Sequence, residues 1–261
     1  MLRSTRTVVV PGWANDCSSI SSLVEALAPA TPESALHVIN IHEGVSEHSP
    51  SGTTNLSPYA YRLAENLEAE SVVIGWSMGG MIAIEAAAVV PDRVSALVLL
   101  ATSPRFCQGE DYRYGFACDQ LDSLADDLRT DTRDALSTFI RWSARPFDIS
   151  DAAMGDRIDA AEGLGLDALL AGLEYLRSQD LRRRLSSITC PTLVMHGRND
   201  AVVPWRGGKQ LADALPRSTW VEMQHAGHDF PLRSPGAIAE HICQFCDALM
   251  PETQTVTPEG S

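Results

Sequence analysis

One serine of the chain lies in a sequence that suits a reactive hydroxyl group. Ser77 is the centre of GWSMG, with the β-branched run SVVIGW before it and the alanine-rich run MIAIEAAAVV after it. A strand that turns directly into a helix strains the backbone of the turn residue, and Gly75 and Gly79 avoid the steric clashes there. A serine hydroxyl is a poor nucleophile by itself, so this interpretation requires a base and an orienting acid elsewhere in the chain. Without them the segment is an ordinary tight turn.

Two later segments offer an acid and a base in the chain order that such a turn predicts, which is serine, carboxylate, histidine. The strand-like run LVMHG leads into RNDAVVP, which places Asp200 just past a strand end. The next strand-like run leads into QHAGHDFP, which contains His225 and His228. The glycine before His228 and its deeper position in the loop favour it as the base, with His225 as a supporting loop residue. Asp229 is the weaker alternative acid, because a residue adjacent to the histidine has poor geometry for orienting its ring.

Two backbone N–H groups are expected to stabilise an oxyanion at the serine. The helix after the turn presents the N–H of Met78 at its positive end. The loop after the first strand, PGWAND, offers the N–H of Trp13, and Gly12 lets that backbone approach a substrate oxygen. The side chains of Trp13, Trp76 and Met78 are candidates for the wall of a substrate pocket. The two tryptophans fit equally well as ordinary buried aromatic residues.

Apolar, β-branched runs alternate with amphipathic helical stretches along the chain. The expected strands are 7–11, 36–41, 71–76, the run that ends near residue 101, 190–197 and 218–223. Helices are expected between them, one of them capped by Ser57 with Pro58 at its first position. Continuously apolar strands that alternate with helices are typical of a mostly parallel sheet covered on both faces. The sequence therefore predicts an α/β fold with about six strands.

Residues 105–187 interrupt this alternation, because they are polar, helical in pattern and contain no strand-like run. A helical insertion between two strands lies over the carboxyl ends of the strands, where open α/β sheets bind ligands. We therefore expect a helical lid at 105–187, a core formed by 1–104 and 188–250, and a disordered polar tail at 251–261.

The composition fits a globular domain and excludes several classes of function. The chain has 261 residues, of which 44% are hydrophobic, and this suffices for a sizeable core. The formal net charge of −14 argues against a nucleic-acid partner, and no apolar run reaches the length of a membrane span. The six cysteines are scattered and no apolar signal segment precedes Thr7, which favours a reduced, cytoplasmic protein. The histidine pair lacks a helical HExxH context and a third ligand, so we expect no metal. Chemistry by a serine, an aspartate and a histidine requires no organic cofactor either.

Four segments together resemble the α/β-hydrolase superfamily and, within it, the pimeloyl-[acyl-carrier protein] methyl ester esterases of biotin biosynthesis. They are PGW, GWSMGG, LLAGLEYLRSQDLRRRLSSITCPTLVMHGRNDAVVP and HAGHDFPLRSP. The stretch GLEYLRSQDLR is the most discriminating, since general esterases do not need it. Two features depart from the family pattern. The first loop usually starts with His-Gly and here has Pro11-Gly12, and the two initial strands of the family are expected to be shortened or absent.

The resemblance implies a serine esterase of α/β-hydrolase fold that works without a cofactor. By this resemblance Ser77, Asp200 and His228 form the catalytic triad, and Trp13 and Met78 are the oxyanion donors. The family hydrolyses the methyl ester of a pimeloyl group carried by an acyl carrier protein, and it releases methanol. The resemblance therefore implies an acyl carrier protein as the partner.

An acyl carrier protein is acidic, as this chain is, so a carrier-binding enzyme needs a local basic face. Family members meet the carrier with arginines of the lid. The lid here offers Arg129, Arg133, Arg141 and Arg145, and the four-residue spacing within each successive pair predicts a common helix face. The same arginines fit equally well as solvated helix residues paired with nearby aspartates, because residues 105–185 contain 11 arginines against 16 acidic residues.

Two other functions also fit the sequence. A general short-chain carboxylesterase, or a hydrolase of carbon–carbon or thioester bonds on the same scaffold, shares the serine, aspartate and histidine and differs in the lid. A ligand-binding protein that retains the site only for recognition is the alternative from another class. The complete set of three side chains argues against it.

Overall fold

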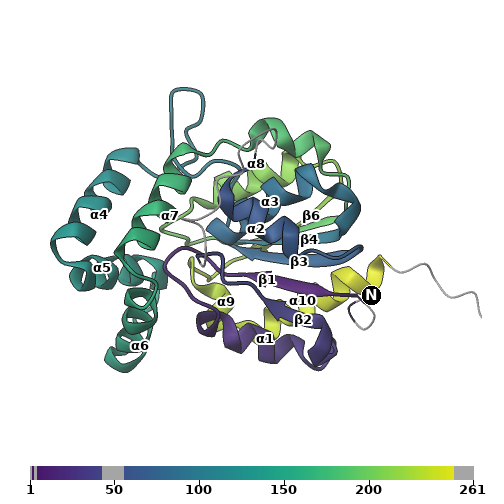
Figure 1. Cartoon of the computed structure of the whole chain (residues 1–261), viewed down its shortest axis with the longest axis horizontal. Coiled ribbons are helices and arrows are strands. Elements are labelled where there is room, and N and C mark those ends of the chain that lie inside the picture. Colours follow the sequence, from purple (N-terminus) through teal and green to yellow (C-terminus); the bar gives the residue numbers. More distant parts are fainter. Residues whose placement is uncertain (1, 3–4, 43–55, 250–261) are drawn as a thin grey trace, which may run out of the picture.

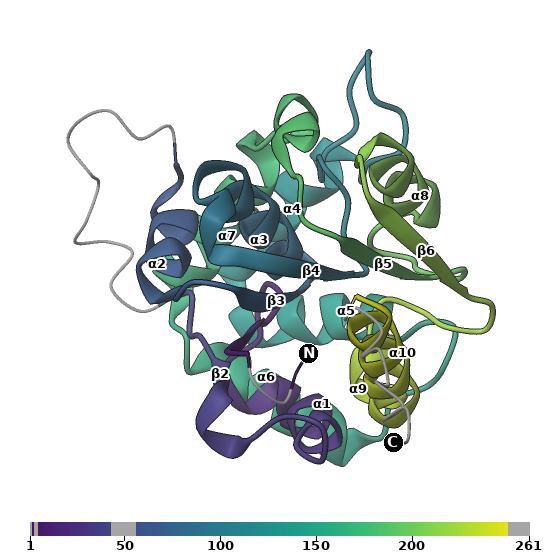
Figure 2. The same cartoon turned by 90° about the vertical axis from the view of Figure 1, so that its right-hand side faces the viewer.

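Six parallel strands form one sheet through the middle of the molecule (Figure 1 and Figure 2). The computed structural model describes residues 2, 5–42 and 56–249. The strands are β1 (Thr7–Val10), β2 (Leu36–Val38), β3 (Ser71–Trp76), β4 (Val94–Leu100), β5 (Thr192–Gly197) and β6 (Ser218–Met223). They lie in the order β2-β1-β3-β4-β5-β6. The expected α/β fold with a parallel sheet of about six strands is confirmed.

Helices cover both faces of this sheet, as Figure 2 shows. One face carries α1 (Ser21–Leu27), α9 (Phe230–Arg233) and α10 (Pro235–Ala248), and the other carries α2 (Pro58–Asn66), α3 (Met78–Val89) and α8 (Trp205–Ala214). Every residue of β1, β3 and β5 is buried, because helices pack on both sides of these continuously apolar runs. The side chains of the two faces accordingly form two apolar clusters.

Three strands are shorter than the apolar runs that predicted them. β1 ends before Pro11 and β5 begins after Pro191, because proline has no N–H to donate to a neighbouring strand. β2 ends at Val38, before the end of its apolar run. The side chain of Asn40 accepts a hydrogen bond from the His42 N–H at 3.0 Å, and this local bond turns the chain away from the sheet.

Four helices are inserted between β4 and β5 and lie at one end of the molecule, on the left in Figure 1. They are α4 (Cys118–Thr130), α5 (Thr132–Ala144), α6 (Asp151–Glu162) and α7 (Leu166–Ser178). All residues of this insertion are described, and they contain isolated β-bridges but no strand. Of the four helices, α7 lies nearest to the sheet (Figure 1).

The helix boundaries correct the expected arginine faces. A break at Asp131 separates Arg129, in α4, from Arg133, in α5. The Asp131 side chain caps α5 by accepting a hydrogen bond from a backbone N–H of the first turn at 3.1 Å. Arg141 lies in the last turn of α5, whereas Arg145 follows the end of that helix. The prediction of two common faces is wrong, because the spacing rule assumes an unbroken helix.

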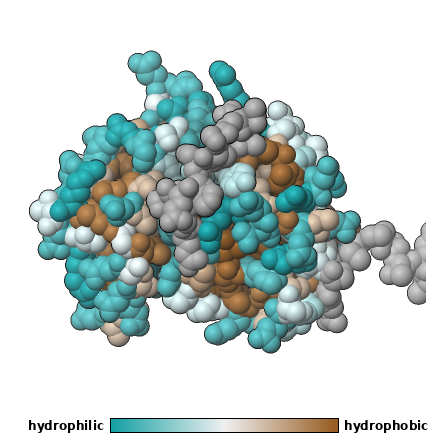
Figure 3. Space-filling model, in the orientation of Figure 1, coloured by the Kyte–Doolittle hydropathy of each residue, from teal (hydrophilic) through white to brown (hydrophobic). Residues whose placement is uncertain are grey.

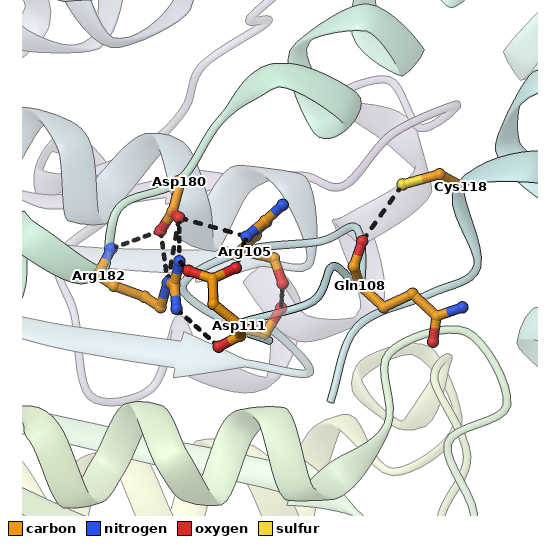
Figure 4. Close-up of polar contacts among 7 residues, drawn as sticks. Arg105, Gln108, Asp111, Cys118, Asp180 and Arg182 are labelled. Carbon is orange, nitrogen blue, oxygen red and sulfur yellow. Dashed lines mark hydrogen bonds and ion pairs between the residues drawn. The ribbon is translucent and has the colours of Figure 1, made fainter. Parts of the chain in front are cut away.

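Ion pairs fasten the two ends of the insertion to each other (Figure 4). Arg105 follows β4, and its guanidinium contacts Asp111 at 2.9 Å and Asp180 at 3.6 Å. Arg182 binds the same two carboxylates from the other end of the insertion, at 2.6 Å and 2.5 Å. A β-bridge joins the backbones of Arg105 and Asp180. The QDLR part of GLEYLRSQDLR therefore closes the base of the insertion.

No helix within the described ranges is both long enough and apolar enough to cross a membrane. The tail expected at 251–261 lies outside the described residues.

Candidate active site

Ser77 occupies the turn between β3 and α3 with φ 55° and ψ −119°, a conformation that costs energy for a residue with a side chain. Its N–H donates to the Leu100 carbonyl at 2.8 Å, and its carbonyl accepts from the Thr102 hydroxyl at 2.8 Å. Leu100 ends the neighbouring strand β4, and Thr102 follows it. The neighbouring strand therefore holds the strained turn in place.

The two glycines that flank this turn have no room for a side chain. A Cβ atom on Gly75 would lie 2.6 Å from the Gly79 carbonyl oxygen, and one on Gly79 would lie 2.3 Å from the Val10 carbonyl oxygen. Contacts this short with backbone atoms force the chain to move. The steric requirement that the sequence predicts at both positions is therefore present in the structure.

His228 lies in the loop after β6, and its ring connects Ser77 with Asp200. The Ser77 hydroxyl donates to Nε2 of the ring at 3.0 Å, and the Nδ1–H donates to Asp200 Oδ2 at 2.8 Å. His228 is only 2% exposed, whereas the alternative histidine, His225, is exposed in the same loop. The structure therefore brings together the serine, the aspartate and the histidine that the chain order pairs.

Asp200 lies in the turn after β5, and its carboxylate is fully buried. Its Oδ1 atom accepts hydrogen bonds from the backbone N–H groups of Val202 and Val203, both at 2.8 Å. Burial alone would raise the pKa of Asp200. The electrostatic attraction of the carboxylate to the His228 ring and the hydrogen bonds from His196 and His228 outweigh burial, so the pKa lies below its usual value. Asp200 is therefore held as a carboxylate that orients the His228 ring.

A second histidine contacts the same carboxylate, although the sequence pattern does not single it out. His196 ends the apolar part of β5 and is fully buried. Its Nε2 lies 3.2 Å from Asp200 Oδ2 and 2.9 Å from the Val203 carbonyl oxygen. Both neighbours are acceptors, so Nε2 carries the proton. The sequence contains one signal for this contact, because His196 is a polar residue that directly follows the apolar run Leu193–Met195 of β5.

The two expected oxyanion donors lie on the two segments that adjoin Ser77. Met78 is the first residue of α3, so its N–H has no acceptor within the helix. The loop after β1 packs on the serine turn, since a Cβ atom on Gly12 would lie 3.2 Å from Ser77 Cβ. The next residue is Trp13, and in the described part of the chain its N–H makes no backbone hydrogen bond.

The three side chains expected around a substrate pocket are buried in two different places. Trp13 and Met78, at 2% and 0% exposure, belong to the apolar cluster that includes the inserted helices. Trp76 belongs to the opposite cluster, and its indole N–H donates to the His228 carbonyl at 3.1 Å. Its ring lies beside the His228 ring, with 5.9 Å between the centroids. Trp76 thus supports the loop that carries His228. This position corrects the expectation that Trp76 forms a pocket wall. It agrees with the alternative, in which Trp76 is an ordinary buried aromatic residue.

Asp229 is tied to arginines and is not free to orient the histidine. It is 2% exposed, and its carboxylate accepts from Arg233 Nε at 2.9 Å and from Arg157 at 3.3 Å. Its N–H donates to the Ser143 carbonyl in α5 at 3.1 Å. Because Arg157 belongs to α6, these contacts anchor the histidine loop to the insertion. The sequence does not predict this anchor, because its partners are far apart along the chain.

The four arginines expected to contact a carrier protein fall into two groups, of which the first is already paired. Arg129 contacts Asp126 at 2.8 Å, and Arg133 contacts Asp159 at 2.9 Å and Glu162 at 2.7 Å. Arg129 lines a groove between α4 and α7, in the part of the surface where Figure 3 shows apolar patches among hydrophilic side chains. These two residues therefore fit the alternative of solvated helix arginines.

The second group lies near the buried aspartate. Arg141 and Arg145 line a hollow of about 590 Å³ whose other residues include Asn199 and Ala201. Asn199 and Ala201 flank Asp200 in the chain, so the hollow adjoins the loop that carries the Asp200 carboxylate. Among the described residues neither guanidinium has an acidic partner within ion-pair distance.

Within the described ranges, no group of three or more histidine, cysteine, aspartate or glutamate side chains is arranged to hold a metal ion. All six cysteines are free thiols.

The fold and the serine turn agree with a known family. A family model described as alpha/beta hydrolase fold matches residues 44–235, which is more than half of the chain. The chain therefore belongs to the alpha/beta hydrolase fold family. The expected class, a carboxylic ester hydrolase on this fold, is confirmed.

Two proteins with the same name are similar to this chain over most of its length. The pimeloyl-[acyl-carrier protein] methyl ester esterase of Pectobacterium atrosepticum is 29% identical over 248 residues, which cover 94% of this chain and 95% of the relative. The protein of the same name from Nitrosomonas europaea is 28% identical over 224 residues, which cover 85% of this chain and 87% of the relative. The resemblance inferred from the sequence motifs is confirmed.

A solved structure has the same architecture. The esterase from Exiguobacterium antarcticum matches with a TM-score of 0.81 at 22% sequence identity, covering 95% of this chain and 93% of that chain. At this identity the likeness establishes the fold alone.

Proposed function

We propose that this chain is a serine carboxylesterase in which Ser77 is the nucleophile, His228 the general base and Asp200 the orienting acid. The observation that carries the proposal is the buried chain of two hydrogen bonds, from the Ser77 hydroxyl to the His228 ring and from that ring to Asp200. This arrangement performs the two tasks that a hydroxyl nucleophile requires, because it removes the proton and stabilises the imidazolium that forms.

In the first half of the reaction Ser77 Oγ attacks the ester carbonyl carbon while His228 Nε2 takes the hydroxyl proton. The carbonyl oxygen becomes a negatively charged oxyanion, and the N–H groups of Trp13 and Met78 stabilise it. His228 then gives its proton to the leaving alkoxide, the carbon–oxygen bond of the ester breaks, and the alcohol departs. The acyl group remains on Ser77.

In the second half a water molecule attacks the acyl-enzyme. His228 takes one proton of the water, the oxyanion forms again at the same two N–H groups, and the bond to Ser77 Oγ breaks. The proton returns to Ser77, which leaves a carboxylic acid as product. Asp200 stabilises the charged ring in both halves.

The substrate we propose is the methyl ester of pimeloyl-[acyl-carrier protein], which yields pimeloyl-[acyl-carrier protein] and methanol. The names of the relatives from Pectobacterium atrosepticum and Nitrosomonas europaea support this choice. We further propose that the insertion at 105–187 is the lid over the site, and that Arg141 and Arg145 contact the acidic carrier. Their position beside the Asp200 loop and their lack of acidic partners among the described residues support this contact.

The carrier contact predicts a selective loss when both free arginines are replaced. In the double variant Arg141→Ala, Arg145→Ala, kcat/KM for the carrier-bound methyl ester should fall about tenfold or more, with a weaker salt dependence, because surface charges of this kind steer association. Hydrolysis of p-nitrophenyl butyrate should stay close to that of the wild type, since a small neutral ester needs no such steering. Steady-state kinetics on both substrates at two salt concentrations measure this difference.

The matched control removes the same charge from the paired arginines, in the double variant Arg129→Ala, Arg133→Ala. It should hydrolyse both substrates as the wild type does. An equal loss on both substrates after the replacement of Arg141 and Arg145, or the same loss in the control, contradicts the carrier contact. Wild-type activity on small esters with no activity on the carrier substrate would favour the general short-chain carboxylesterase.

A further inference from the structure

The side chain of Trp13 is anchored on the inserted helix α7. Its indole Nε1–H donates to the Leu169 carbonyl at 2.9 Å across 156 positions of the sequence, and the bond is buried. Its ring also packs edge-on against Phe139 of α5, with 4.7 Å between the ring centroids. Both helices that hold the ring belong to the insertion.

Gly172, three residues after Leu169, gives the Trp13 ring its space. A Cβ atom on Gly172 would lie 2.5 Å from Trp13 Cδ1 and 3.0 Å from Nε1. Residues three apart share one face of a helix, so Leu169 and Gly172 present a single surface to the ring. Glycine weakens a helix interior, and this contact gives the physical reason for a glycine in the middle of α7.

The backbone beside the Trp13 ring needs external support. Ala14 has φ 56°, in the left-handed region that residues with a side chain avoid. The Trp13 carbonyl accepts a hydrogen bond from the Asn15 side chain at 2.7 Å. Trp13 is thus held on the far side of its Cα atom, at its carbonyl, by Asn15, and through its side chain by Leu169. A donor held in this way is already oriented before an oxyanion forms.

We propose that α7 is a positioning element of the oxyanion hole, and that Leu169 and Gly172 fix the backbone N–H of Trp13 through its indole ring. This inference rests on the proposed function, in which that N–H binds the oxyanion. It assigns Gly172, the first residue of GLEYLR, and Leu169, three residues before it, a role in the chemical step as well as in covering the site. Leu169 and Gly172 act through Trp13 and touch no reacting atom.

A double-mutant cycle of Trp13→Phe and Gly172→Ala tests the proposal. Trp13→Phe removes the indole N–H and keeps an aromatic ring, while Gly172→Ala places a methyl group where the ring lies. Each single variant should lower kcat for p-nitrophenyl butyrate about 10- to 100-fold and leave KM within about twofold, because a displaced donor weakens transition-state binding. Binding of a trifluoromethyl ketone, which forms a tetrahedral adduct with a reactive serine, should weaken by the same factor as kcat.

The two changes should not be additive, because both act on the same ring. The double variant should have a kcat no lower than that of the worse single variant. The matched control is Gly155→Ala in α6, where a Cβ atom would meet nothing within 4 Å, and it should match the wild type in kcat and in inhibitor binding. Circular dichroism and thermal unfolding of every variant show whether the fold is kept.

Three results overturn the inference: a wild-type kcat in either single variant, a rise in KM alone, or losses that multiply in the double variant. If Gly172→Ala does not fold, Trp13→Phe decides the question by itself with the same two readouts. A different result would contradict the proposed function itself: the Ser77→Ala variant would still hydrolyse p-nitrophenyl butyrate. An inactive Ser77→Ala together with an unaffected Gly172→Ala overturns only the role of α7.

Discussion

Ser77→Ala should lower kcat for p-nitrophenyl butyrate about 10⁵- to 10⁶-fold while the protein stays folded. The reaction loses its nucleophile, and no acyl-enzyme can form. Alanine also carries a Cβ atom, so the backbone strain at φ 55° is unchanged, and the hydrogen bonds to Leu100 and Thr102 use only the Ser77 backbone. Steady-state hydrolysis, with circular dichroism as the check on folding, measures the effect.

Covalent labelling tests directly whether Ser77 is the nucleophile. A fluorophosphonate should phosphonylate the wild type once, at Ser77, and should not label Ser77→Ala. The matched control is Ser123→Ala, which removes the hydroxyl of an exposed serine in α4 and should react like the wild type. Turnover or labelling that persists in Ser77→Ala would show that another residue is the nucleophile.

Asp200→Asn should lower kcat about 10⁴-fold while KM changes little. An asparagine side chain can offer its N–H₂ group to Nδ1, which stabilises the wrong tautomer of His228 and leaves Nε2 protonated toward Ser77. Val202 and Val203 can still donate to the amide oxygen, so the turn itself should persist. The exposed carboxylate of Asp213 supplies the control, and Asp213→Asn should leave kcat unchanged.

The lowered pKa of Asp200 also predicts how this substitution changes the dependence of stability on pH. A carboxyl whose pKa is lower in the folded state than in the unfolded state stabilises the fold above the unfolded value, which is about 3.9. That contribution is lost as the pH falls through the lower folded value. The free energy of unfolding should therefore fall more steeply with acid, below about pH 4, in the wild type than in Asp200→Asn. Urea unfolding between pH 3 and pH 7 measures both curves, and identical slopes would contradict the assigned shift.

The serine turn, the parallel sheet and the order of the three site residues could be predicted from the sequence, because each depends on residues that are close together in the chain or on the order of the strands. The serine turn could be predicted because backbone sterics alone require glycine at positions 75 and 79, and the structure shows both clashes. The parallel sheet could be predicted because the runs that form β1, β3, β4 and β5 are largely apolar. The order of the serine, aspartate and histidine followed from the order of the strands, since each of these residues lies just after a strand end.

The parts that could not be predicted depend on partners that are distant in the sequence or on a break that spacing ignores. Counting four residues from Arg129 to Arg133 assumes one helix, but Asp131 ends α4 and caps α5. Trp76 could be assigned to a pocket or to the core only once the sheet assigned each side chain to a face. The contact between Arg157 and Asp229 spans 72 positions of the sequence, so no local sequence pattern predicts it.

These distant contacts give the insertion a wider role than that of a cover. Arg157 of α6 anchors the residue after His228, and Leu169 of α7 anchors Trp13. The insertion therefore contacts the loop of the proposed base and the loop of one proposed oxyanion donor. A substitution that removes either of these two contacts is expected to change kcat even when it lies outside the substrate path.

The intact mass of a methyl pimeloyl-loaded acyl carrier protein, measured after incubation with the enzyme, reports directly on the proposed reaction. We expect the carrier to keep its acyl chain and to lose only the mass of one methylene unit, as the methyl ester becomes a carboxylic acid and methanol is released. The Ser77→Ala variant should leave the mass unchanged. A carrier that loses the whole acyl chain would show thioester cleavage instead, and an unchanged mass with the wild-type enzyme would contradict the proposed substrate.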